Sequence, residues 1–155
     1  MHAEALPQPP GLSALDFWLG CWAVESRSGE PAGVDVVERA VGGHAVLEHW
    51  RDVGGTEGES LFYYDGRAAT WKQVWVMRGL VKQKELVAAV EGMVRFEGHA
   101  FLDDVTVPDR TTLTALADGT VAQLIEHSLD DGATWRASFD AIYRRVDQCR
   151  SSLRL

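Results

Sequence analysis

The sequence predicts an all-β domain: a closed antiparallel up-and-down barrel of about ten strands, preceded by a short N-terminal helical turn. Short segments of alternating apolar and polar residues recur at the spacing typical of all-β proteins, and turn signals separate them. No segment of helical length has a convincing 3.6-residue period. About ten strands joined by tight turns must split into a sandwich or close, and closure removes exposed edges, so we favour the barrel.

The elements follow one another along a single domain expected at residues 13–146. Residues 1–12 are rich in proline and are expected to form a flexible arm, and residues 147–155 a C-terminal tail. A helical turn begins at Ser13, a good N-cap, and ends at Gly20. The segment 80–90 also has a helical alternative. Strands are expected at 21–27, 34–41, 44–52, 59–64, 70–78, 81–89, 92–99, 110–117, 120–128 and 134–145.

Composition and charge exclude several classes of function. The chain has 155 residues, 46% of them hydrophobic, and a net charge of −8. Its longest Lys/Arg run is Arg144-Arg145, so nucleic acid is not an expected partner. No apolar run approaches the roughly 18 residues of a membrane span, and the N-terminus lacks the features of a secretory signal. The sequence therefore predicts no membrane partner and a cytoplasmic location.

Cys21 and Cys149 are the two cysteines of the chain. They are too far apart in sequence to have metal-ligand spacing, and the expected strand separates His44 and His49 onto opposite faces. No metal site is predicted. The cysteines could meet if the first and last strands are neighbours, although a reducing cytosol disfavours a disulfide.

The segment Gly20-Cys21-Trp22, directly after the helical turn, resembles the G-x-W element of the calycins, which include lipocalins and fatty-acid-binding proteins. In that superfamily the Trp packs at the closed end of the barrel, and an arginine from the last strand lies across its face. The resemblance implies these structural roles for Trp22 and for Arg144 or Arg145. A guanidinium over an indole contributes about 1–2 kcal/mol when partly desolvated.

The chain is also similar to a largely uncharacterised bacterial lipocalin-like family that opens with an F-W-L-G-x-W segment. This similarity covers residues 16–145, and it implies a calycin-like barrel without a settled activity. Its further echoes are Gly42-Gly43 with Glu48-x-Trp50, Trp71-x-Gln73-x-Trp75, Gly92-Met93-Val94, Asp118-Gly119, Asp130-Asp131-Gly132 with Trp135, and Phe139-Asp140-x-x-Tyr143.

Charged residues assign the faces of several strands, because successive side chains point to opposite sides. In the last strand, Arg136, Asp140 and Arg144 on the outside turn Arg145 inward, which makes it the better partner of Trp22. The same reasoning, together with the preferred faces of 44–52 and 120–128, places further residues in the lumen. The expected ligand-binding residues are Trp50, Trp71, Gln73, Trp75, Gln123, Trp135, Phe139 and Tyr143. The candidate catalytic residues are Glu48 and His127.

The hairpin of 34–52 allows two registers. A three-residue turn places Glu38, Glu48 and Trp50 on one face, whereas a two-residue Gly42-Gly43 turn places Glu38 with Leu47 and His49. We favour Glu48 and Trp50 inward because Arg51 then points out. In 120–128 we favour Val121, Gln123, Ile125 and His127 inward.

An aromatic lumen with few polar groups is typical of a small-molecule site. The first hypothesis is therefore the binding of a small, partly aromatic or lipophilic molecule in the barrel. The alternative is an enzyme that cyclises, isomerises, hydrates or hydrolyses such a molecule, with a desolvated Glu48 as general acid or base and His127 or Glu126 as its partner. Haem binding through His44, His49, His99 or His127 is a third alternative. No other cofactor is expected, and a homodimer is an alternative to a monomer.

Overall fold

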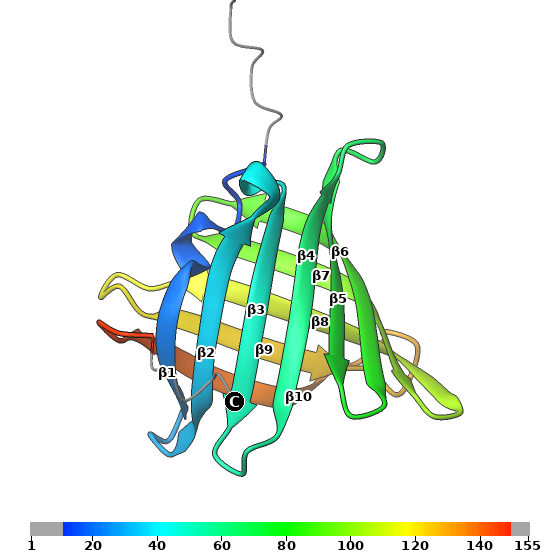
Figure 1. Ribbon diagram of the computed structural model, residues 1–155. Helices are drawn as coiled ribbons and strands as arrows, with labels where there is room; N and C mark the ends of the chain where they lie inside the picture. Colours follow the sequence, from blue (N-terminus) through cyan, green and yellow to red (C-terminus); the bar gives the residue numbers. More distant parts are fainter. Residues whose placement is uncertain (1–10, 150–155) are drawn as a thin grey trace, which may run out of the picture.

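Alternating apolar and polar residues form ten strands that wrap into a closed antiparallel barrel (Figure 1). The computed structural model describes residues 11–149. Each strand pairs with its neighbours in sequence, and β1 pairs with β10 to close the ring. The strands are β1 (Gly20–Ser26), β2 (Pro31–Ala40), β3 (Ala45–Asp52), β4 (Glu57–Asp65), β5 (Thr70–Met77), β6 (Leu80–Val90), β7 (Met93–Leu102), β8 (Val105–Ala115), β9 (Val121–His127) and β10 (Arg136–Arg145).

The predicted all-β barrel of about ten strands is confirmed, with small changes in the strand ends. The segment 80–90 is the strand β6, so its helical alternative is wrong. The expected arm 1–12 lies outside the described residues except for its last two, and Leu12 packs against the core. The expected tail 147–155 is described only as far as residue 149.

The β2–β3 hairpin has the register of the two-residue alternative. Val37 pairs with Glu48 and Glu38 with Leu47, while a 3-10 turn, η2 (Val41–Gly43), fills the connection. Glu38 therefore points outward, and the three-residue alternative is wrong. Glu48 is nevertheless buried in the barrel, as favoured from the sequence, because an inward residue of β3 stays inward in this register.

One end of the barrel is closed by the segment before β1. A 3-10 turn, η1 (Asp16–Trp18), lies over this end, and its Trp18 is completely buried. Trp18 meets Phe62 edge to face at 5.5 Å between ring centroids. The closed end is filled by a cluster of buried apolar side chains: Leu15, Trp18, Trp22, Val37, Val46, Phe62, Trp71, Val94, Phe96, Leu113, Val121 and Tyr143.

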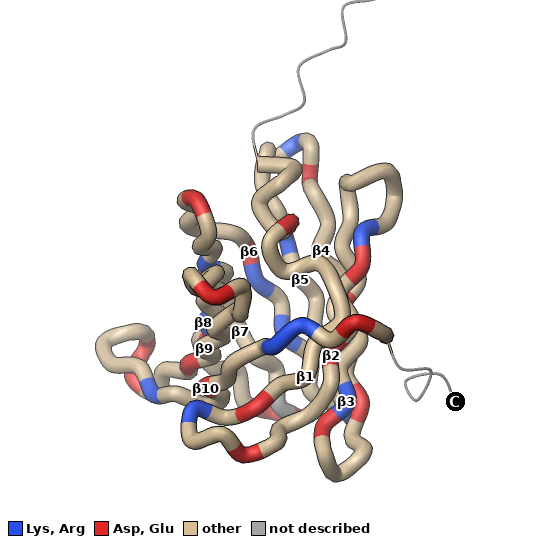
Figure 2. The backbone as a smooth tube through the Cα atoms, turned by 90° about the vertical axis from the view of Figure 1, so that its left-hand side faces the viewer, with Lys and Arg blue, Asp and Glu red and all other residues tan. Residues whose placement is uncertain are grey.

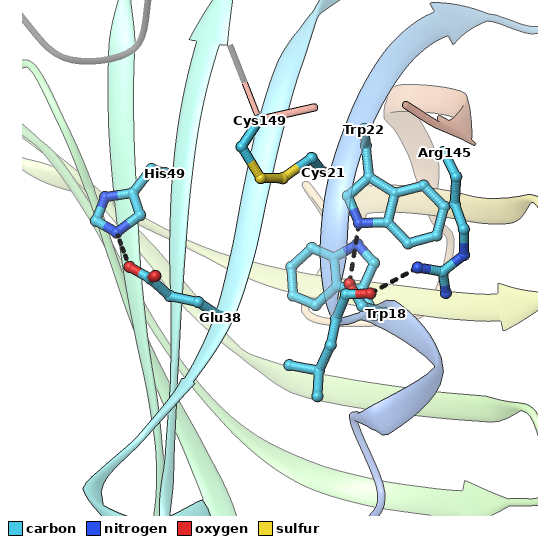
Figure 3. Close-up of a disulfide and its surroundings, with 8 residues drawn as sticks. Trp18, Cys21, Trp22, Glu38, His49, Arg145 and Cys149 are labelled. Atoms are coloured by element: carbon cyan, nitrogen blue, oxygen red, sulfur yellow. Dashed lines mark hydrogen bonds and ion pairs between the residues drawn. A yellow bond between two sulfur atoms is a disulfide. The ribbon is translucent and has the colours of Figure 1, made fainter. Parts of the chain in front are cut away.

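Trp22 and Arg145 tie the first strand to the last at this end. The Arg145 guanidinium lies 4.3 Å from the centre of the Trp22 ring, the contact expected from the sequence (Figure 3). Its two terminal nitrogens donate to the backbone carbonyls of Leu19 and Phe17 at 2.8 and 3.1 Å. The Trp22 indole N–H donates to the carbonyl of Trp18 at 3.0 Å. The arginine therefore fixes η1 as well as β1.

A disulfide joins Cys21 in β1 to Cys149 after β10 (Figure 3). β1 and β10 are neighbours, and the Cα atoms of the two cysteines lie 5.2 Å apart. The bond spans 128 residues of sequence and so links the two ends of the barrel's chain.

Acidic and basic residues are interspersed around the barrel rather than gathered by sign (Figure 2). Most ion pairs are on the surface, as in Arg144–Glu25 and Arg27–Asp140, both at 2.7 Å. In residues 11–149 no helix has the length and apolar character to cross a membrane.

Candidate functional site

A cavity of about 230 Å³ lies inside the half of the barrel opposite η1. This volume is below the roughly 300–1,000 Å³ of sites for drug-sized ligands, so it suits a body of one or two rings. Its residues come from the six strands β3, β5, β6, β8, β9 and β10. They are Glu48, Trp50, Gln73, Trp75, Met77, Leu80, Lys82, Lys84, Thr111, Gln123, Ile125, Ser138, Phe139 and Tyr143.

Aromatic side chains line the cavity toward the open end of the barrel. Trp50 of β3 meets Phe139 of β10 edge to face at 5.7 Å between ring centroids. The Trp75 indole lies over Gly58 of β4, where an added Cβ would come within 2.4 Å of the ring. Only glycine permits this approach, so Gly58 sets the position of Trp75.

The deeper part of the cavity is polar. Gln73 of β5 donates from Nε2 to the Ser60 hydroxyl at 3.0 Å, and the Tyr143 hydroxyl donates to Oε1 of Gln123. Burial raises the pKa of Tyr143 well above its usual value, and nearby Asp35 and Glu48 raise it further. Tyr143 therefore remains a donor at neutral pH.

A buried ion cluster lies along the inner wall formed by the adjacent strands β6, β7 and β8. Lys84 pairs with Asp109 and donates to Thr111, while Lys82 lies 3.0 Å from Asp109. Burial lowers the pKa of Lys84 to about 8, and Asp109 opposes the change. Gly98 of β7 lies between them in register, pairing with both Lys84 and Asp109. Because Gly98 has no side chain, the lysine and the aspartate can meet across it; an added Cβ would lie 2.7 Å from Cα of Lys84.

Two carboxyl groups are buried beside this cluster. Asp35 is 1% exposed and Glu48 is 4% exposed. Burial raises the pKa of Asp35 well above its usual value, and the negative charge of Glu48 raises it further. Burial also raises the pKa of Glu48, but hydrogen bonds with Ser60 and Asp35 and the charge of Lys84 oppose it. Burial therefore favours the protonated form of Asp35 more strongly than that of Glu48.

Six of the eight residues expected to bind ligand line the cavity: Trp50, Gln73, Trp75, Gln123, Phe139 and Tyr143. Glu48, the first candidate catalytic residue, lines it as well. Trp71 points into the barrel but is 1% exposed and belongs to the packed closed end, where its indole N–H donates to the carbonyl of Gly11 at 2.6 Å.

Trp135 and His127 depart from the prediction. Trp135 precedes β10 and packs outside the cavity under Arg110, whose guanidinium carbon lies 4.1 Å from the ring centre. Its expected inward position is wrong because a register shift between Ala137 and Phe139 breaks the alternation on which it was based. His127 is the last residue of β9 and does not line the cavity, so it is not placed to act with Glu48.

No described histidine lines the cavity, so His44, His49, His99 and His127 are not placed to ligate a haem bound there. His49 points outward from β3 and bridges Glu38 and Glu59, each at 3.1 Å (Figure 3 shows the contact with Glu38). Within residues 11–149 no three His, Cys, Asp or Glu side chains gather in a way that could hold a metal ion.

Sequence reasoning missed the ionic part of the lumen, namely Lys82, Lys84, Asp109, Thr111 and the neighbouring Asp35 and Ser60. A signal for the lysines was present. Arg78-Gly79 forms a two-residue turn with positive φ at both positions, so Met77 pairs with Leu80. This register places Lys82 opposite Trp75 and Lys84 opposite Gln73, hence on the same inward face.

Comparison with known proteins does not assign the chain. No protein-family model matches it, and no curated protein is significantly similar to it.

Proposed function

We propose that this protein binds a small, partly aromatic or lipophilic molecule in the barrel cavity, in the manner of a calycin-like binding protein. One observation carries the proposal: an aromatic-lined cavity of about 230 Å³ lies in the half of the barrel that η1 does not plug. An apolar wall with a few convergent polar groups is the usual composition of a small-molecule site.

The exposure of the rings supports the same proposal. Trp18, Trp22 and Trp71 are each at most 1% exposed, whereas Trp50 and Trp75 are only partly buried although they face the lumen. A ligand that covers the two partly buried indoles would gain roughly 25 cal/mol for each Å² of apolar surface removed from water.

Calorimetric titration with naphthalene derivatives tests the proposal. The protein should bind at least one derivative, and Trp75→Ala should weaken that binding at least about tenfold because the indole forms part of the wall. Trp135→Ala is the matched control, since this indole packs on Arg110 outside the cavity and its loss should leave the affinity unchanged. Equal effects of the two substitutions, or no binding to the native protein, would contradict the proposal.

Glu48 favours a second candidate, an enzyme that acts on such a ligand. Its carboxyl lines the cavity, has a raised pKa, and forms no ion pair with the described residues. A desolvated carboxyl of this kind is suited to general acid or base catalysis. If the ligand is converted, Glu48→Gln should retain binding and lose conversion, as followed by mass spectrometry of the incubated ligand. Unchanged conversion would exclude Glu48 from the reaction.

A further inference from the structure

Gln73 presents an unpaired acceptor to the cavity. Its Nε2 donates to the Ser60 hydroxyl at 3.0 Å, with the amide oriented so that Oε1 points away from Ser60. The remaining Oε1 is buried and has no hydrogen-bond partner among the described residues. A buried acceptor of this kind calls for a donor that the protein itself does not supply.

Gln123 presents the complementary group. Its Oε1 accepts from the Tyr143 hydroxyl, so the amide nitrogen Nε2 is the group of this side chain that remains to donate to a ligand. Gln73 lies on β5 and Gln123 on β9, and both line the same cavity. The polar, deeper part of the cavity therefore has a hydrogen-bond acceptor on β5 (Gln73) and a donor on β9 (Gln123).

Both lysines of this part of the cavity already face carboxylates. Lys82 and Lys84 both contact Asp109, and Glu48 interacts with the charge of Lys84. Asp35 is 1% exposed, and this burial favours its neutral form. A charged head group would add an unmatched charge to a layer removed from water, which is costly.

We propose that the ligand has an uncharged head group, a hydroxyl or primary carboxamide, that donates to Oε1 of Gln73 and accepts from Nε2 of Gln123. This inference rests on the proposed binding function and adds the chemistry of the head group. The aromatic or lipophilic body then lies against Trp50 and Trp75, and a carboxylate is rejected.

Four probes with one ring system separate the head groups. 2-Naphthol and 2-naphthamide carry both a donor and an acceptor, 2-methoxynaphthalene carries only an acceptor, and 2-naphthoate is charged. Calorimetric titration at pH 7 should give a Kd at least about tenfold lower for the first two than for the ether and the carboxylate, the effect of one hydrogen bond left unmade in a buried site.

Gln73→Leu should remove the preference. Binding of 2-naphthol should fall to that of 2-methoxynaphthalene, while the affinity for the ether stays within about twofold. Gln83→Leu is the matched control, because this glutamine is exposed on the outer face of the adjacent strand β6. If Gln73→Leu does not fold, the ranking of the four probes on the native protein tests the head-group inference.

The outcomes distinguish the two proposals. If the ether or the carboxylate binds as tightly as the alcohol in a Trp75-dependent way, the cavity binds ligands and the head-group inference alone is wrong. If none of the four probes binds, both proposals are wrong.

Discussion

Tryptophan occurs in both halves of the barrel, and the two halves use it differently. In the closed half, Trp18, Trp22 and Trp71 are 0–1% exposed, and the indoles of Trp22 and Trp71 donate to backbone carbonyls of residues 18 and 11. In the open half, Trp50 and Trp75 face the lumen but remain partly exposed. The first group is core and the second is cavity wall.

The two groups of tryptophans differ because η1 covers only one end of the barrel, not because of the rings themselves. η1 and the residues before it cover the closed end and supply both packing surface and hydrogen-bond acceptors. At the other end the described residues supply no such cover, and the inward positions include Lys82, Lys84 and Glu48. Aromatic residues on inward-facing positions are therefore not by themselves evidence of a ligand site, because the packing beyond them decides their role.

The largest expected effect is on the closed half. Trp18→Ala should lower the free energy of unfolding by about 3–5 kcal/mol, because the cavity left by a fully buried ring cannot be filled. Trp75→Ala should cost about 1 kcal/mol, since its ring is partly exposed and gives up less buried area. Urea denaturation measures both. Equal losses would remove the distinction between the two halves.

The disulfide should stabilise the closed half by about 2–4 kcal/mol, because it closes a loop of 128 residues in the unfolded chain. Cys21→Ser should show this loss in urea denaturation, and adding Cys149→Ser should cost nothing more. Reductant should reproduce the effect in the native protein. Two alkylated thiols in the non-reduced native protein would contradict the bond.

Arg145→Met should cost about 1–2 kcal/mol, because it removes the cation over Trp22 and two hydrogen bonds that hold η1. Arg144→Met is the control in the next position. Arg144 forms a surface ion pair with Glu25, so its loss should barely change the thermal unfolding midpoint. A similar drop for both variants would show that Arg145 does not clamp the closed end.

The smallest expected effect is a change in how the free energy of unfolding depends on pH, caused by Asp35. The pKa of Asp35 is raised in the folded state, so its stabilising contribution is complete below the unfolded value of about 4 and is lost as the pH rises toward the folded value. Asp35→Asn cannot ionise. Its stability relative to the native protein should therefore increase between pH 4.5 and pH 7.5 in urea titrations.

Asp130→Asn is the control of opposite sign. Hydrogen bonds from Thr134 and Ser128 lower the pKa of Asp130 to about 2, so its contribution is present above pH 4 and lost as the pH falls toward 2. The loss caused by Asp130→Asn should thus be greater at pH 7.5 than at pH 2.5. A constant difference for Asp35→Asn across the range would show that Asp35 is ionised in the folded protein.

The sequence determined the strands, because strand alternation and turn residues are local properties. Asp65-Gly66 and Asp118-Gly119 mark hairpins wherever the chain goes, and charged residues such as Lys72 assign the face of their strand without tertiary information. For the same reason Gln73, Trp75, Phe139 and Tyr143 were placed inside the barrel.

Only the tertiary structure decided how far along the barrel axis an inward residue lies and what it meets there. Trp71 and Trp75 share a face of β5, yet one is core and one lines the cavity, because strand tilt and η1 set the level of each. Trp135 lies outside the lumen because the β9–β10 pairing has a register shift. Lys84 can be buried because Asp109 reaches it across Gly98, a meeting of three strands that no local pattern encodes.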